Sequence, residues 1–254
     1  MDPGFRSPLI DFFRRGEVAH DVRLMAAQGA LAPRAHEQLA LLILLSDDSD
    51  PVIATNANAT LDVLPTEPLQ AFLARSDVPA QMRQFFADRG VVAAGQAAIE
   101  AGEPLVDTSD VPDIAGQPQD ESAESQLLSA LPIIDRMKLA MKGTRAQRAQ
   151  LIRDPNKLVA AAVLSSPKLT EVEVEAFAKM ANVTEEVLRT IAMNRMWTKN
   201  YGVIAGLAKN PKTPPAISMT LLQRLNERDL KMLTIDRNVP EAVRLAARRL
   251  TTKG

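Results

Sequence analysis

Short apolar segments bounded by proline, aspartate or asparagine recur along the chain. In residues 153–170, RDPNKLVAAAVLSSPKLT, an apolar run lies between Asp-Pro and Ser-Ser-Pro, and the segment EVEVEAFA follows it. Asp is a favourable N-cap, and Pro is a favourable first helical residue. We therefore expect a helix that starts at Asp154 with the proline after it and ends before Pro167. The next helix is expected after Thr170, which has capping-box spacing to Glu173.

The same order of residue types occurs in the N-terminal part of the chain. Residues 50–86 read DPVIATNANATLDVLPTEPLQAFLARSDVPAQMRQFF, so Asp50 and Pro51 are expected to open a helix and Pro65 to end that segment. Two further helices are expected after Pro65. Both parts of the chain therefore follow one plan of short helices with proline at the corners.

The spacing of these corners in the C-terminal part indicates a repeat. Pro167 and Pro211 are 44 positions apart, and Asn194 and Asn238 are also 44 apart. This period is typical of HEAT and armadillo repeats, in which stacked units bury apolar faces that no single helix can bury alone. The pattern predicts an all-α fold, a HEAT/armadillo-like α-solenoid of stacked short helices.

The composition fits a helical protein and excludes several kinds of site. Aromatic residues make up 4% of the chain, and there are only 11 glycines, whereas β-rich proteins need aromatic and β-branched runs. The chain has no cysteine. Disulfides, thiolate metal sites and cysteine nucleophiles are therefore excluded.

Charge divides the chain into an acidic and a basic part. Residues 1–125 carry a net charge of −12 and residues 126–254 one of +11. Residues 100–126 contain eight acids and no base and are rich in Pro, Gly and Ser, so we expect a flexible acidic linker. This predicts an acidic helical-repeat part at 1–99 and a basic helical-repeat domain at 127–254. The linker has the charge to mask the basic domain until a partner competes with it.

The repeat residues also carry a family resemblance. The segment at 139–178, LAMKGTRAQRAQLIRDPNKLVAAAVLSSPKLTEVEVEAFA, and the segment at 236–250, DRNVPEAVRLAARRL, resemble uncharacterised bacterial HEAT-like repeat proteins. More distantly, they are similar to leucine-rich-repeat-variant and armadillo-like solenoids. The resemblance covers about residues 130–250. It implies a scaffold-like protein and brings no catalytic residues.

No pattern of residues indicates catalysis, a metal or a cofactor. His20 and His36 are the only histidines, and they lie too far apart for a pair on one helical face. The chain has no P-loop, no dinucleotide-binding glycine motif, no G-x-S-x-G and no H-E-x-x-H. We therefore expect a protein that is not an enzyme and has no metal site and no cofactor.

Basic residues of the C-terminal part are candidates for binding an anion or a partner. Arginine suits phosphates and carboxylates because its planar fork forms two parallel hydrogen bonds. The alternative interpretation is the solvated face of ordinary helices. The candidates are Arg145, Arg148, Arg153, Lys157, Arg244, Arg248 and Arg249.

Two aromatic residues are candidates for lining a groove. Trp197 and Tyr201 are four positions apart, so on one helix they would share a face and offer a stacking platform. The alternative is that they belong to the core. A DNA glycosylase, another class with helical repeats, would also need a carboxylate near the flipped base. No such acid is identifiable in the sequence.

These patterns favour a binding protein over an enzyme. We expect a non-catalytic scaffold or adaptor that binds a protein or peptide through a helical-repeat groove. The alternative is nucleic-acid binding through the basic C-terminal domain. The most apolar run, residues 39–45, is too short to span a bilayer, and the first residues lack a secretory signal, so a cytoplasmic location without membrane contact is expected.

Overall fold

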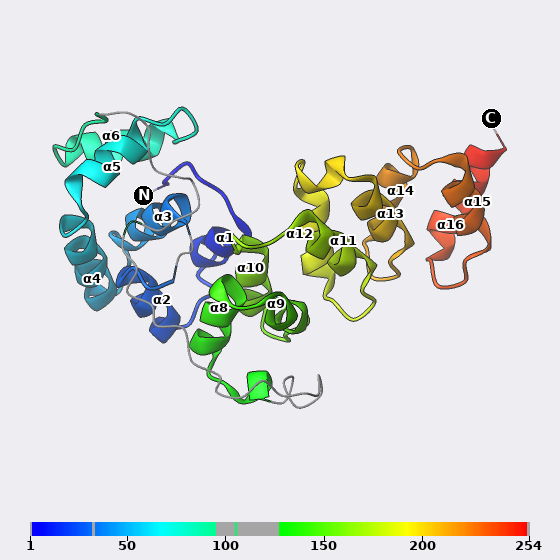
Figure 1. The fold of residues 1–254 in the computed structure, drawn as a ribbon, viewed down its shortest axis with the longest axis horizontal. Coiled ribbons are helices and arrows are strands. Elements are labelled where there is room, and N and C mark those ends of the chain that lie inside the picture. Colours follow the sequence, from blue (N-terminus) through cyan, green and yellow to red (C-terminus); the bar gives the residue numbers. More distant parts are fainter. Residues whose placement is uncertain (1, 32–33, 95–104, 106–126, 253–254) are drawn as a thin grey trace. The chain divides into compact units, whose positions relative to one another are not determined.

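All the regular secondary structure in the described part of the chain is helical. The computed structural model describes residues 2–31, 34–94, 105 and 127–252 (Figure 1). These residues form helices and no β-strand, which confirms the predicted all-α class. Apart from Leu105, the predicted linker at 100–126 lies outside the described residues, so its flexibility and its masking role stay predictions.

Two compact units make up the chain. The first comprises Met1–Thr144 with Ala161–Lys168, and the second comprises Arg145–Ala160 with Leu169–Gly254. The expected division at residues 99 and 127 stays a prediction, because the linker that defines it is not described. Helix α10 (Lys157–Ser165) begins in the second unit and ends in the first.

The other helices lie within one unit each. Those of the first unit are α1 (Pro8–Arg14), α2 (His20–Ala27), α3 (Ala35–Leu45), α4 (Pro51–Asp62), α5 (Thr66–Leu73), α6 (Ala80–Asp88) and α8 (Ile133–Lys142). Those of the second unit are α9 (Arg145–Leu151), α11 (Glu171–Lys179), α12 (Glu185–Met193), the 3-10 helix η1 (Trp197–Lys199), α13 (Tyr201–Lys209), α14 (Pro215–Leu222), α15 (Glu227–Ile235) and α16 (Glu241–Thr251).

Helix α3 forms the centre of the first unit. Its apolar run is buried on every face, and α1, α2, α4 and α6 all contact it. A helix that is hydrophobic all round is expected in a core rather than at a surface. Three polar residues of its first turn, His36, Glu37 and Gln38, are buried with it.

Most predicted helix ends are found where the sequence placed them. The Asp50 side chain caps α4 by accepting a hydrogen bond from the Val52 N–H. The Thr170–Glu173 capping box is present at the start of α11.

The helix start predicted at Asp154 is wrong. Helix α10 begins at Lys157, and Asn156 caps it by accepting a hydrogen bond from the Leu158 N–H at 2.9 Å. Asp154 is buried, and its carboxylate accepts a hydrogen bond from the Asn156 N–H at 2.8 Å. This bond lies in the turn that precedes the helix. The sequence offers two capping residues in this turn, and the second of them caps the helix.

Neighbouring helices of the second unit are joined by packing and by polar bonds at their ends. Helix α11 packs against α13, α13 against α14, and α16 against both α14 and α15. The buried Asn210 amide, after α13, donates to the carbonyls of Ala178 and Met180 at the end of α11, both at 2.9 Å. Arg224, after α14, donates to the Thr198 carbonyl at 2.6 Å.

One of the two predicted 44-residue spacings joins equivalent turns. Ser166, before Pro167, donates to the Met141 carbonyl and accepts from the Lys168 N–H. Asn210, before Pro211, bonds in the same way to an earlier helix end and to the N–H two residues ahead.

The other spacing does not join equivalent positions. Asn194 is the C-cap residue of α12, whereas the C-cap residue of α15 is Asp236, and Asn238 lies further along the loop. Asparagine and aspartate can both accept a hydrogen bond from the N–H two residues ahead. The search for a second asparagine therefore paired Asn194 with Asn238, although the residue at the equivalent helix end is Asp236.

Candidate binding groove

The basic residues predicted around α9 have different environments. Arg145 and Arg153 are exposed. Lys157 is also exposed and forms an ion pair with Glu186 at 3.2 Å. These three side chains lie on the surface of the second unit and can reach a partner.

Arg148, by contrast, is buried and belongs to the core. Its Nε and Nη2 atoms lie 2.9 and 2.8 Å from the Glu173 carboxylate, and the two side chains are only 4% and 2% exposed. Burial alone would raise the pKa of Glu173, but hydrogen bonds from Thr170 and from Arg148 lower it on balance. Arg148 therefore joins α9 to the capping box of α11 and is not accessible to an anion.

The predicted basic residues of α16 form a second, separate group. Arg248 and Arg249 are exposed, Arg244 is half-buried, and Arg248 donates to the Thr234 carbonyl at 3.3 Å. Figure 1 shows α9 and α16 at opposite ends of the second unit. The seven predicted basic residues therefore do not gather at one site.

The two aromatic residues predicted to line a groove do not share one helix, as the expected platform required. Trp197 lies in η1 and is half-buried, whereas Tyr201 is the first residue of α13. Asn200 stands between them as the N-cap of α13 with an extended backbone, so the helical i, i+4 geometry does not apply. Tyr201 is 40% exposed and does line a groove.

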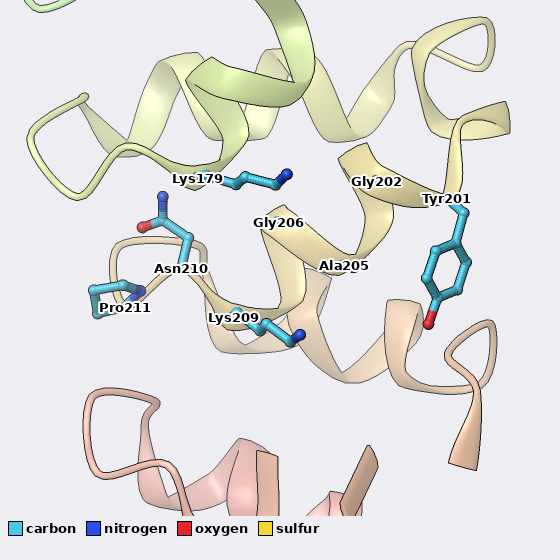
Figure 2. A pocket seen from close by; sticks show the side chains of 8 residues that line it. All are labelled: Lys179, Tyr201, Gly202, Ala205, Gly206, Lys209, Asn210 and Pro211. Carbon is cyan, nitrogen blue, oxygen red and sulfur yellow. The ribbon is translucent and has the colours of Figure 1, made fainter. Parts of the chain in front are cut away.

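This groove runs along α13 and has a volume of about 310 Å³ (Figure 2). Its lining comes from the end of α11, from α13 and from the turn after α13. Figure 2 shows Lys179 and Lys209 on opposite sides of the α13 segment that carries the two glycines. The lining residues are Lys179, Tyr201, Gly202, Ala205, Gly206, Lys209, Asn210 and Pro211.

The two glycines bring α11 and α13 close together. A Cβ atom at Gly206 would lie 3.1 Å from Cγ of Lys179 and 3.2 Å from Cβ of Ala178. A Cβ atom at Gly202 would lie 2.3–2.5 Å from the carboxyl atoms of Glu175. The missing side chains allow Glu175, Ala178 and Lys179 of α11 to pack directly against the backbone of α13.

Each lysine of the groove is paired with a carboxylate. Lys179 Nζ lies 2.6 Å from Glu175 Oε1, and Lys209 Nζ lies 2.6 Å from Asp229 Oδ1 on α15. The Tyr201 hydroxyl donates to the other oxygen of Asp229. These bonds, first from Lys209 and then from Tyr201, lower the pKa of Asp229, while burial and the bond to Asp229 raise the pKa of Tyr201.

Sequence reasoning found Tyr201 and missed the rest of the groove. Two glycines at i, i+4 inside the helical segment YGVIAGLAK were the available clue. A glycine inside a helix costs about 1 kcal/mol relative to alanine, so a pair of them on one face usually has a packing or binding reason.

The two histidines have structural surroundings. His20 Nε2 lies 3.0 Å from an Asp50 carboxylate oxygen. His36 stacks on Phe5 and meets Phe72 edge-on, and burial lowers its pKa. No group of three or more metal-binding side chains occurs within the described part of the chain.

Glu37 of α3 is a buried carboxylate that sequence reasoning did not single out. Burial raises its pKa, and the Ser7 hydroxyl, Arg34 and the Ser165 hydroxyl offset part of this effect. Its Oε2 atom has no hydrogen-bond partner among the described residues. The sequence clue was an acid in the first turn of a helix whose later residues are all apolar.

No family model, curated protein or solved structure matches this chain. The HEAT/armadillo-like interpretation therefore rests on the repeat pattern and on the helical structure. None of the helices in the described ranges has both the length and the apolar character needed to cross a bilayer.

Proposed function

We propose that the protein is a non-catalytic scaffold whose second unit is a HEAT/armadillo-like stack of helices. In this proposal, a peptide segment of a partner protein binds in the groove along α13. The observation that carries it is the groove along α13, whose lining includes Gly202 and Gly206 between two lysines.

The polar bonds between helix ends support the repeat. Asn210 joins α13 to α11, and Arg224 joins the end of α14 to η1. In both cases the bond joins the end of a helix to an element that precedes it in the same unit. Such nearest-neighbour contacts are typical of solenoids, which use their extended surfaces to hold partners.

The groove has suitable walls for a peptide. Ala205 and Pro211 offer apolar contact along the groove. Lys179 and Lys209 supply hydrogen-bond donors on either side, and Tyr201 presents a polar tip at one end. Concave sites with apolar walls and a few convergent polar groups are typical ligand sites.

Nucleic-acid binding is the second candidate function. The second unit has a net charge of +8, and the exposed Arg145, Arg153 and Arg249 have no ion-pair partner among the described residues. Phosphate contacts of this kind would make affinity fall steeply with salt. The separation of α9 from α16 favours the peptide, because it divides the predicted basic residues between two places.

A random peptide library selected on the purified full-length protein tests the proposal. The amide NMR signals of Gly202 and Gly206 then report whether a selected peptide enters the groove, with Gly143 of the first unit as the control. We expect shifts at both groove glycines and none at Gly143.

Two outcomes would count against this function. If no selected peptide moves the groove glycines, the groove is not a peptide site. If instead labelled DNA or RNA binds with a steep salt dependence that Arg248→Glu and Arg249→Glu reduce, the protein is a nucleic-acid binder.

A further inference from the structure

Two carboxylates of the protein itself lie beside the groove, each paired with one of its lining lysines. Glu175 lies against Cα of Gly202, at the place where any other residue would put its Cβ atom. It forms an i, i+4 ion pair with Lys179 at 2.6 Å, and its side chain is 31% exposed. Two residues of the groove lining, Lys179 and Gly202, therefore already hold a carboxylate between them.

The second carboxylate, Asp229, is held more firmly. It bonds to Lys209 and to the Tyr201 hydroxyl, and its own N–H donates to the Asn226 side chain that caps α15. Its side chain is 18% exposed. Among the described residues, Glu175 bonds to Lys179 alone, so Glu175 is the carboxylate that can leave and Asp229 the one that stays.

We propose that the groove binds an acidic peptide segment, whose carboxylate replaces that of Glu175 on Lys179 and against Gly202. This inference rests on the proposed function and names the chemistry of the peptide. The exchange replaces one exposed Lys–carboxylate pair with another, so it requires little reorganisation of the protein. The net charge of +8 on the second unit favours an acidic ligand over a basic one.

The lining of the groove suits a peptide better than a nucleic-acid backbone, because apolar residues stand beside its lysines. The groove lining contains two lysines and no arginine. The apolar contacts at Ala205 and Pro211 also suit a peptide, whose acidic side chains alternate with less polar ones.

Substitution of Glu175 by glutamine tests the exchange, and the chain offers a matched control. Glu227 and Lys231 of α15 form another i, i+4 pair at 2.6 Å, outside the groove lining. The peptide library is selected in parallel on the wild-type, Glu175→Gln and Glu227→Gln proteins. Affinities of the peptides that shift Gly202 and Gly206 are then measured by titration calorimetry.

We expect the peptides that enter the groove to be enriched in Asp and Glu. Glu175→Gln removes the internal competitor and should tighten their binding by about two- to five-fold, while Glu227→Gln leaves it unchanged. Lys179→Gln should weaken the same peptides by about five-fold or more, whereas Lys231→Gln should not.

The results separate this inference from the function on which it rests. Groove-binding peptides without acid enrichment, or an affinity that Glu175→Gln leaves unchanged or weakens, overturn the acidic ligand and leave peptide binding intact. The absence of any groove-binding peptide overturns the proposed function itself.

Discussion

At the scale of the residue, the ion pair between Arg148 and Glu173 joins α9 to α11 inside the second unit, with both side chains buried. Arg148→Met leaves the Glu173 carboxylate buried without its cation. We expect this variant to lose about 3–5 kcal/mol of unfolding free energy, measured by urea denaturation at neutral pH. The double variant Arg148→Met/Glu173→Gln should recover part of the loss, since glutamine is neutral and still serves in a capping box.

Arg145 on the same helix is the matched control for this prediction. It is exposed and forms no ion pair among the described residues. Arg145→Met should change the unfolding free energy by no more than about 0.5 kcal/mol. Equal losses at positions 145 and 148 would show that the pair with Glu173 is not what stabilises this region.

Glu37 provides a prediction of pH dependence. Its folded-state pKa is raised above the ordinary value of 4.5, so the folded chain holds this proton to higher pH than the unfolded chain does. Its contribution to stability is complete below pH 4.5 and is lost as pH rises through the folded pKa. We therefore expect Glu37→Gln to raise the melting temperature at pH 8 and to change it little at pH 4.

The exposed Glu67 of α5, in the same unit, serves as the comparison. Glu67→Gln should leave the melting temperature nearly unchanged at both pH values. A Glu37→Gln variant that is destabilised at pH 8 would mean that the ionised carboxylate has a stabilising partner.

At the scale of the element, hydrogen bonds between helix ends distinguish two asparagines that look alike in the sequence. Asn210 is buried and its side chain donates to two carbonyls at the end of α11, whereas the side chain of the half-buried Asn194 accepts from N–H groups of its own turn. Asn210→Ala leaves the buried Ala178 carbonyl and the part-buried Met180 carbonyl without this donor and should cost about 2–4 kcal/mol. Asn194→Ala should cost about 1 kcal/mol or less by the same chemical denaturation.

At this scale the sequence predicted that the helices form, but it did not predict which helices pack against each other. Apolar spacing and caps such as Asp50 and Thr170 act within one turn, so the sequence contains all the information needed for them. The start of α10 was misplaced because both Asp154 and Asn156 can cap, and only packing buries the first of them. The groove was missed because its walls come from α11, α13 and the turn after α13.

At the scale of the whole molecule, the chain has two compact units that each contain their own buried residues. Chains of this kind commonly depart from two-state unfolding. We expect scanning calorimetry to resolve two overlapping transitions. Glu37→Gln should move only the transition of the first unit, and Arg148→Met only that of the second. A single transition that both substitutions move as a whole would contradict this expectation.

The sequence by itself determined the helical class, most helix ends and the uneven distribution of charge. These properties depend on the order of residues within a few turns or on composition, and neither requires knowledge of distant neighbours. The tertiary structure alone decided which basic residues are accessible: it buries Arg148 against Glu173 and leaves Arg145 exposed. The tertiary structure also formed the groove, because Gly202 and Gly206 line it together with a lysine from α11, and a carboxylate of α11 packs against Gly202.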